Sequence, residues 1–464
     1  MNINREFSQY RPAIQAMMKK GKIPGLSIII IDGDKQPFIK NFGYADLERK
    51  IPVNSHTLFQ LASCSKSFTA LAALKLEEQG LIHLDSPVST YLPWFRARFR
   101  RFKNREITLR QLLHHSSGIP WTTICDIPAG NSGQMLEQTV RNIKNTRLKH
   151  SPGRWFTYAT INYDIIGAVI ETVTRLPFET YMEREIFQPL GLLHTVVGVD
   201  TSRPGQAVGY KSGFPRPFRY EAPVFRGNNP AAYILSTPGD MARWLMLQLG
   251  LIDSPMKSLI ERSHLPDESV PSHWLTRSYY GMGWFIRREN RDPVFHGGLN
   301  PNFACECWLK LGRKRAIAVL SNSNSMETFA IANFVKWFLF NEREPRGVYL
   351  PGFQYTRFSW FMTVVSGIFL AGAAAGVILK VQALLTGMSR FLPVTLETLT
   401  RAAGTGLALV AALAVGRYAP KLKWKYFWET LIVWKPRIFL IALRLFLTSV
   451  GAGYFLYLLS LFTW

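Results

Sequence analysis

Two side chains that can do chemistry together stand three residues apart, Ser63 and Lys66. The following stretch, 70–80, is rich in alanine and leucine and ends at a glycine, which predicts a helix. Side chains three residues apart on a helix share a face, so the lysine can reach the serine hydroxyl. A serine hydroxyl is a poor nucleophile unless an adjacent base accepts its proton. The pair therefore predicts nucleophilic catalysis, although Ser-x-x-Lys matches also arise by chance at solvated helix starts.

Two later stretches, in the right order along the chain, supply the other groups that an activated serine needs. Tyr158 lies on a loop before an apolar helical stretch, and a tyrosine held near Lys66 can carry a proton to a leaving group. His296 begins a His-Gly-Gly run at the start of a predicted strand, where the glycines let a substrate backbone come close. We expect the backbone N–H groups of Ser63 and Leu299 to form an oxyanion hole.

These groups must be positioned by a domain that has strands near both ends and helices between them. Residues 25–33 form a short apolar run that ends in a turn, which is typical of a buried strand, and residues 37–44 can pair with it as a hairpin. Strand patterns return after the helical middle at 280–286, which we predict to be one strand, and at 294–311 and 316–321. This pattern suits an α/β domain whose sheet is completed by the C-terminal strands, with a helical insertion over one edge.

The four cysteines of the chain indicate little about its redox compartment. They are Cys64, Cys125, Cys305 and Cys307. Cys305 and Cys307 fall in an apparent strand, and we assign their side chains to opposite faces, where they cannot easily bridge each other. Cys64 is interpreted as a small buried hydrophobic residue. The cysteine spacing fits no metal-binding motif.

The adjacent histidines His114 and His115 have no third ligand at a suitable spacing. We interpret them as structural support for the turn at Ser117 and Gly118. The sequence therefore predicts neither a metal nor another cofactor.

The chain is strongly basic, with 55 Lys and Arg against 31 Asp and Glu and a formal net charge of +24. Such a charge requires that nucleic-acid binding be considered. The basic residues are spread out, however, and the tight cluster at 96–105 is interleaved with phenylalanines. We interpret this cluster as a solvated loop, with attraction to anionic lipid as the second interpretation. Nucleic acid is not an expected partner, because no nucleic-acid-binding motif accompanies the cluster.

Apolar residues concentrate toward the C-terminus and predict a membrane segment of about three helices. We predict a catalytic domain over 1–345, a linker over 346–357 and a transmembrane domain over 358–464. The predicted helices span 358–379, 391–416 and 438–463. The middle one crosses a bilayer only if its charged residues, Glu397 and Arg401, pair with each other or reach the interface.

The orientation in the membrane is a conflict between two arguments. The stretch 417–437 is strongly basic, and basic loops stay in the cytoplasm. With three spans this rule places the N-terminal domain in the cytoplasm, whereas with two spans it places that domain outside. The first 22 residues have no apolar core of a signal peptide.

The three motifs together resemble those of the serine β-lactamase and penicillin-binding superfamily, and within it the class C-like peptidases. The second motif here has Thr160 where the family has asparagine, and the third is His-x-Gly rather than Lys-Thr-Gly. Supporting matches occur at 112–118, 189–191 and 280–284, and the resemblance covers about residues 10–340. It implies an α/β domain with an antiparallel sheet flanked by helices, and an acyl-enzyme mechanism in which the catalytic residues are Ser63, Lys66 and Tyr158.

A narrower similarity is to the colibactin-maturing, prodrug-activating D-asparaginyl peptidases, which carry three transmembrane helices after the catalytic domain. Matching stretches include 158–167, 209–214, 229–234 and 296–303. This similarity implies hydrolysis of an amide bond that removes an N-acyl-D-asparagine prodrug motif from a nonribosomal peptide or polyketide, outside the cytoplasm. It also implies substrate contacts, which we assign to Thr160, Asn228, His296, Gly298 and Asn300. Thr160 replaces a serine and Asn228 replaces a histidine of that group.

Two alternatives to this function stay open. The first is a D,D-peptidase, β-lactamase or esterase of the same superfamily. The second is a non-catalytic membrane sensor that binds a ligand in a retired active site. The expected partners are a small N-acyl-D-amino acid substrate and the lipid bilayer, and a homodimer is left open.

Overall fold

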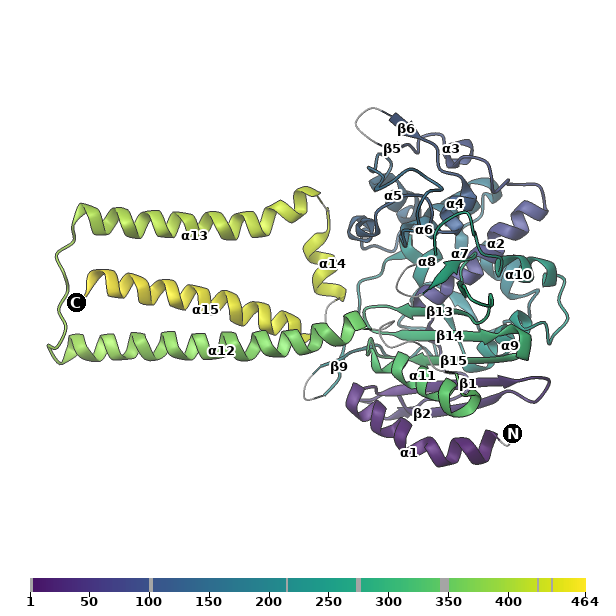
Figure 1. Cartoon of the computed structure of the whole chain (residues 1–464), viewed down its shortest axis with the longest axis horizontal. Helices are drawn as coiled ribbons and strands as arrows, with labels where there is room; N and C mark the ends of the chain where they lie inside the picture. Colours follow the sequence, from purple (N-terminus) through teal and green to yellow (C-terminus); the bar gives the residue numbers. More distant parts are fainter. Residues whose placement is uncertain are drawn as a thin grey trace. The chain divides into compact units, whose positions relative to one another are not determined.

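The computed structural model describes residues 3–99, 103–213, 216–272, 277–342, 350–423, 425–434 and 437–464. The chain divides into two compact units, Met1–Tyr349 and Leu350–Trp464. Figure 1 shows the mixed α/β character of the first unit and the helical character of the second.

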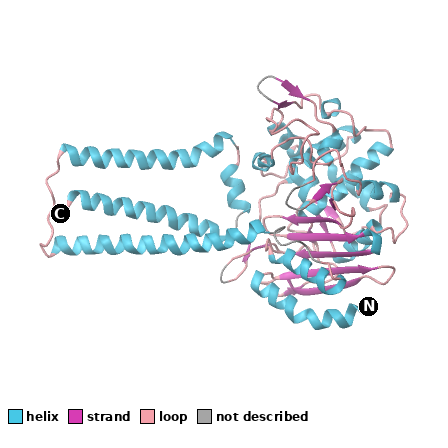
Figure 2. Cartoon of the chain, in the orientation of Figure 1, coloured by secondary structure: helices cyan, strands magenta, loops and turns pink. Residues whose placement is uncertain are grey.

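An eight-stranded antiparallel sheet forms the centre of the first unit, as Figure 2 shows in magenta. Its strand order is β11-β12-β13-β14-β15-β1-β2-β3. The strands are β1 (Gly25–Asp32), β2 (Phe38–Asp46), β3 (Ile51–Pro52), β11 (Ser278–Tyr280), β12 (Phe285–Arg287), β13 (Val294–Leu299), β14 (Ala304–Lys310) and β15 (Arg315–Ser321). β1 pairs with β2 on one side and with β15 on the other, so the N-terminal hairpin and the completion of the sheet by C-terminal strands are both confirmed.

Helices cover both faces of this sheet. The helices of the first unit are α1 (Ile3–Gly21), α2 (Ser65–Glu78), α3 (Val88–Tyr91), α4 (Leu109–Leu113), α5 (Met135–Asn142), α6 (Ile161–Thr174), α7 (Phe178–Tyr181), α8 (Asn229–Ala232), α9 (Pro238–Gln248), α10 (Lys257–Ser263) and α11 (Glu327–Phe340). Short helical turns are η1 (Ala62–Cys64), η2 (Trp121–Asp126), η3 (Met182–Phe187), η4 (Arg226–Asn228) and η5 (Leu311–Arg313). Minor strands are β4 (Phe59–Gln60), β5 (Ala97–Phe99), β6 (Lys103–Arg105), β7 (Val196–Val197), β8 (Tyr210–Lys211), β9 (Phe218–Arg219) and β10 (Ile234–Ser236).

The apolar run of β1 follows from its burial on both faces. Ile28 and Ile30 pack in the core beneath α1 and α11, whereas Ile29 and Ile31 belong to the larger core on the α2 and α9 side. Side chains alternate between the two faces of a strand, so a strand with helices on both sides needs apolar residues at every position. The same core on the α2 side holds the elements that carry the predicted catalytic residues.

Two expectations about strands are wrong. Residues 280–286 are not one strand, because Gly283 has a φ of +85° and turns the chain between β11 and β12. Cys305 and Cys307 do not point to opposite faces, because residues two apart on a strand share a face. Both thiols point to the α2 side of β14.

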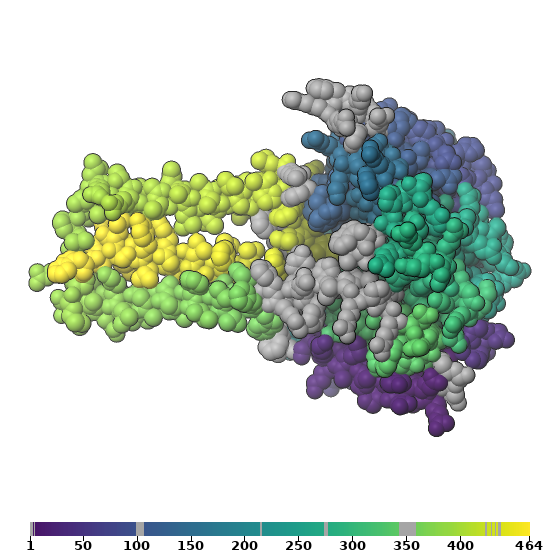
Figure 3. Space-filling view, viewed as in Figure 1, coloured from purple at the N-terminus to yellow at the C-terminus, as the bar shows by residue number. Residues whose placement is uncertain are grey.

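The second unit contains four helices among its described residues: α12 (Leu350–Leu385), α13 (Leu396–Lys423), α14 (Phe427–Trp434) and α15 (Arg437–Phe462). Three segments are long and apolar enough to cross a membrane: Ser359–Leu385, Leu396–Leu422 and Ile438–Phe462. In these segments at most 11% of the most apolar window is buried within the protein, so few of their side chains are covered. Figure 3 shows the same helices in green to yellow. The predicted linker 346–357 lies partly outside the described residues, and α12 already begins within it.

Glu397 and Arg401, near the start of the middle segment, are paired. Arg401 donates to Glu397 at 2.5 Å, one turn apart on α13. Pairing of these two charges was one of the two conditions given for this segment to span a bilayer, because pairing lowers the cost of placing charges near lipid.

Candidate active site

Ser63 lies in the helical turn η1, which leads directly into α2. Ala62 before it has a φ of +47°, a left-handed conformation that is uncommon for a residue with a side chain. Two hydrogen bonds tie the turn to β10: the Leu61 N–H donates to the Ile234 carbonyl at 2.9 Å, and the Ile234 N–H donates to Ser65 Oγ at 3.1 Å. The backbone around Ser63 is thus held by tertiary contacts, and its side chain is left partly exposed.

Lys66 is completely buried and has three hydrogen-bonding neighbours. Its Nζ lies 3.1 Å from Ser63 Oγ, 3.3 Å from Thr160 Oγ1 and 2.9 Å from the Ala231 carbonyl. Burial lowers the pKa of Lys66 to about 7, and the nearby Asp164 opposes this shift. A neutral amine has two N–H donors and one lone pair. Donation to Thr160 and Ala231 therefore leaves the lone pair directed at the serine hydroxyl.

Tyr158 stands beside this pair on the loop before α6, as the sequence predicts. Its ring centre is 5.2 Å from Lys66 Nζ. Burial raises the pKa of Tyr158, and the Ser63 hydroxyl opposes the rise. The phenol is consequently protonated at neutral pH and can donate a hydrogen bond next to Ser63.

His115 fixes the loop that carries Tyr158. The Thr157 N–H donates to the His115 carbonyl at 2.8 Å, and His115 Nδ1 lies 3.0 Å from Asn162 Nδ2 and 3.4 Å from the Ala159 N–H. Burial lowers the pKa of His115 well below its usual value, so the ring is neutral and Nδ1 can accept these bonds. Structural support by this histidine was predicted for the turn at 117–118, and the structure extends it to the tyrosine loop.

The end of β13 lies directly against the turn of Ser63. A Cβ on Gly298 would be 2.5 Å from the Leu61 carbonyl and 2.9 Å from Ser63 N, so only glycine fits there. This approach brings the backbone of Leu299 beside that of Ser63, where both amides were predicted to bind an oxyanion.

The His296 side chain is engaged within the protein. Its Nε2 lies 3.0 Å from the Tyr280 hydroxyl, and its Nδ1 donates to the Gly297 carbonyl at 2.8 Å. His296 was predicted to bind substrate. Its ring is 1% exposed, and these contacts suit it to hold the strand that faces the site.

Asn300 is fully buried next to the same strand end. Its Nδ2 donates to Gln60 Oε1 at 2.8 Å and to the Ala232 carbonyl at 3.0 Å. A carbonyl oxygen can only accept, so these bonds fix which side of the amide is nitrogen. The Asn300 Oδ1 has no hydrogen-bond partner among the described residues, which is costly for a buried acceptor.

Asn228 and Thr160 complete the wall around Lys66. Thr160 is bonded to Lys66 as described, at the start of α6. The Asn228 amide nitrogen, turned toward Asp164, lies 3.0 and 3.2 Å from the two carboxyl oxygens. The predicted substrate residues are thus brought together, but the Asn228 side chain has a partner within the protein.

Asp164 was missed from the sequence. It is fully buried on the first turn of α6, between Lys66 and Asn228, and burial raises its pKa well above the usual value. A carboxyl group in the first turn of an otherwise apolar helix resembles ordinary helix capping. The sequence signal that could have indicated its role was its position six residues after Tyr158. In the fold, its helix α6 packs against α2, which carries Lys66.

A hydroxyl, a buried amine, a phenol and two backbone amides therefore converge, which is an arrangement suited to acyl transfer. A family model described as Beta-lactamase matches residues 11–340. The chain belongs to the Beta-lactamase family. The family is one of serine hydrolases, and the predicted fold class is confirmed.

Relatives of this β-lactamase-family chain carry different names. Protein flp of Staphylococcus aureus (strain MRSA252) is 31% identical over 323 residues, which cover 69% of this chain and 64% of that protein. A protein named Beta-lactamase from Escherichia coli (strain K12) is 29% identical over 62% of this chain and 73% of its own length. The chain thus spans about two thirds of the length of the curated relatives it matches.

A solved structure has the same fold. The octameric penicillin-binding protein homologue from Pyrococcus abyssi superposes with a TM-score of 0.63 and 26% identity. The match covers 77% of this chain and 81% of that one.

Proposed function

We propose that this chain is a membrane-anchored serine peptidase that removes an N-acyl-D-asparagine group from a nonribosomal peptide or polyketide product. The observation that supports catalysis is the 3.1 Å contact between Ser63 Oγ and a buried Lys66 amine whose pKa is lowered to about 7. The observation that supports the substrate is the buried oxygen of Asn300, which has no hydrogen-bond partner in the described part of the chain.

Ser63 Oγ attacks the amide carbonyl carbon, and its proton passes to the lone pair of Lys66. The resulting oxyanion accepts hydrogen bonds from the backbone N–H groups of Ser63 and Leu299. As the carbon–nitrogen bond breaks, the Tyr158 hydroxyl donates a proton to the departing amine and is reprotonated from Lys66. Water then attacks the acyl-enzyme ester, with the same base accepting its proton, and restores Ser63.

The substrate side chain is recognised by polar groups that can form hydrogen bonds with a carboxamide. A side-chain amide offers N–H donors, and the Asn300 Oδ1 is an acceptor that no described residue satisfies. Thr160 Oγ1 is a second polar group 3.3 Å from the amine of Lys66. Asn228, held by Asp164, presents its carbonyl oxygen on the side away from that carboxyl. A substrate lacking the amide leaves the Asn300 oxygen buried and unpaired, which disfavours it.

The helical unit supplies the membrane attachment. Three segments are apolar and long enough to span a bilayer. An N-acyl substrate is amphipathic, and tethering the hydrolase to the bilayer raises its effective concentration near such molecules. By resemblance we place the catalytic unit outside the cytoplasm, in the periplasm or the extracellular space. Protease accessibility of that unit in intact cells tests this placement.

The test uses the purified full-length chain in detergent with a matched series of amides. The substrates are N-myristoyl-D-asparaginyl, L-asparaginyl, D-aspartyl and D-alanyl amides of one fluorogenic amine. We expect release of the amine from the D-asparaginyl compound at least about 10²-fold faster than from the others. Ser63→Ala should abolish release, and Asn300→Leu should reduce the preference for D-asparagine more than it reduces turnover of the D-alanyl compound. Equal turnover of all four amides would contradict the proposed substrate.

A second candidate function is a D,D-peptidase, β-lactamase or esterase, favoured by the names of the E. coli and P. abyssi relatives. Turnover of a D-alanyl-D-alanine peptide, a cephalosporin or a simple ester, without action on the D-asparaginyl amide, would establish it. A non-catalytic sensor would bind the D-asparaginyl compound and leave Ser63 unlabelled by a fluorophosphonate.

A further inference from the structure

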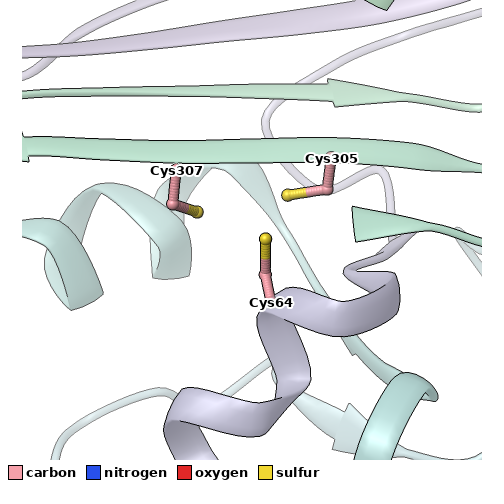
Figure 4. A group of neighbouring side chains, drawn as sticks. All are labelled: Cys64, Cys305 and Cys307. Carbon is pink, nitrogen blue, oxygen red and sulfur yellow. The ribbon is translucent and has the colours of Figure 1, made fainter. Parts of the chain in front are cut away.

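Three buried thiols meet directly behind the turn that carries Ser63. Cys64 is the next residue along η1, and Cys305 and Cys307 project from β14 (Figure 4). The three Sγ atoms lie within 4.8 Å of one another, and no side chain among them is more than 2% exposed. Figure 4 shows the three sulfur atoms directed toward a common centre. Neither the hydrolytic site nor the proposed substrate contacts use them.

The arrangement follows from a long-range contact. Cys305 and Cys307 are two residues apart on a strand and therefore share a face. The sheet register places this face against η1, to which Cys64 belongs. Cysteine spacing along the chain could not indicate such a cluster, because the third thiol comes from a segment more than 200 residues away.

The geometry points to a site for a thiophilic monovalent metal ion: we propose that Cys64, Cys305 and Cys307 bind Cu(I) and that the bound ion inhibits the hydrolase. Thiolate sulfur is the ligand type that selects Cu(I), and three sulfurs with no fourth His, Cys or carboxylate ligand among the described residues suit a trigonal site. An ion about 2.3 Å from each of three coplanar sulfurs holds them about 4 Å apart. The observed cluster lies within 4.8 Å, so small side-chain movements are enough.

Coordination requires the thiolate form of each cysteine, so metal binding displaces thiol protons to solvent and the affinity increases with pH.

Inhibition follows from the hydrogen bond that Cys64 makes. Its Sγ–H donates to the His296 carbonyl at 3.2 Å, linking η1 to β13. Loss of this proton on metal binding removes the bond and places an anionic sulfur against a carbonyl oxygen. The Ser63 turn and the Gly298 backbone are in close contact where η1 meets β13. Repulsion between the sulfur and the carbonyl at this contact therefore moves the two oxyanion amides apart. A misplacement of about 1 Å there can cost on the order of 10² in rate.

The experiment measures copper directly and needs no substrate. The reduced full-length chain is titrated anaerobically with Cu(I) buffered by a competing chelator, and bound copper per chain is determined after desalting. We expect one Cu(I) in the wild type and in Cys125→Ser, the matched control at the fourth, buried cysteine. Cys305→Ser and Cys307→Ser should each lose it, and X-ray absorption should show sulfur ligands only.

The functional arm uses labelling of Ser63 by a fluorophosphonate, which does not depend on the identity of the natural substrate. One equivalent of Cu(I) should slow labelling at least tenfold in the wild type and in Cys125→Ser. A chelator should reverse the effect, and Cys305→Ser should be unaffected by copper. If neither the wild type nor any variant reacts with the fluorophosphonate, the proposed hydrolytic function fails. Copper binding is still tested in that case, because it is measured as bound copper per chain.

Three results would overturn the proposal. Equal amounts of bound copper in the wild type and in Cys305→Ser would show that the ion binds elsewhere. If the wild type retains no copper in competition with the chelator, the thiols only pack the core. A loss of two free thiols without bound copper means that the cluster forms a disulfide instead. Circular dichroism of Cys305→Ser and Cys307→Ser ensures that lost binding is not lost folding.

Discussion

Two groups of buried reactive side chains flank the turn Ala62–Cys64, and they differ in how their polar atoms are satisfied. On one side the amine of Lys66 contacts a hydroxyl of Ser63, a hydroxyl of Thr160 and a backbone carbonyl. On the other side three thiols contact one another, with one hydrogen bond to the backbone of β13. The first group is built for proton transfer, and the second is a packed cluster that becomes chemically active only when a thiophilic ion enters.

Burial alone therefore does not define an active site. Both groups are buried, and burial shifts the pKa values of Lys66 and Cys64 in opposite directions, because it disfavours the ammonium in one and the thiolate in the other. Burial therefore activates the lysine as a base and deactivates that cysteine as a nucleophile. Four variants test this contrast, in decreasing order of expected effect.

Removing the amine should have the largest effect. Lys66→Met keeps most of the length and the packing of the side chain but has no amine to accept the Ser63 proton. We expect the second-order rate of fluorophosphonate labelling, and kcat/KM for any turned-over amide, to fall by at least about 10³-fold. Labelling at the wild-type rate would show that another group activates Ser63.

Moving the oxyanion backbone should have the next largest effect. Gly298→Ala forces a Cβ to within 2.5 Å of the Leu61 carbonyl, and backbone must shift to relieve it. We expect a loss of about 10²-fold in kcat with little change in KM. Gly297→Ala is the matched control, because the atoms nearest to its Cβ belong to the Phe329 ring, at 3.1 Å and beyond, and it should lose much less. Similar losses in both variants would contradict a role for this close approach.

Removing the Asp164 carboxylate next to the Lys66 amine should change the pH dependence of the rate more than it changes the maximal rate. The rate should rise with pH as Lys66 loses its proton, with a midpoint near its pKa of about 7. Asp164 raises that pKa, so Asp164→Asn should move the midpoint to lower pH. Asp240→Asn, at a buried acid on α9 outside the site, should leave it in place. A midpoint shifted to higher pH in Asp164→Asn would contradict the assignment.

Removing a thiol should have the smallest effect, and the affected quantity should be the stability of the fold. Cys305→Ala removes one buried sulfur and leaves a small cavity, which costs about 1 kcal/mol. In metal-free buffer we expect the melting temperature of the catalytic unit to fall by about 2 °C. A rate loss as large as that of Lys66→Met would show that the thiols take part in hydrolysis and would remove the contrast between the two sides.

Local sequence patterns could predict the elements but not all of their partners. The Ser63–Lys66 pair, the Tyr158 loop and the strand with His296 were predictable, because each depends on spacing within a few residues. The hairpin between β11 and β12 was missed, because the positive φ of Gly283 depends on its packing against the backbone of Ser67. The role of Asp164 was missed, because helix capping explains an acidic residue at that position equally well.

Residue types and short spacings are enough to indicate the family, the order of the catalytic motifs and the apolar helices long enough to span a membrane. The chain carries these features whatever its conformation. Which groups meet follows from the folded chain: Asp164 with Lys66 and Asn228, Gly298 with Ser63, and Cys64 with Cys305 and Cys307. These contacts join segments far apart in the chain, and they are fixed by sheet register and helix packing rather than by any local pattern.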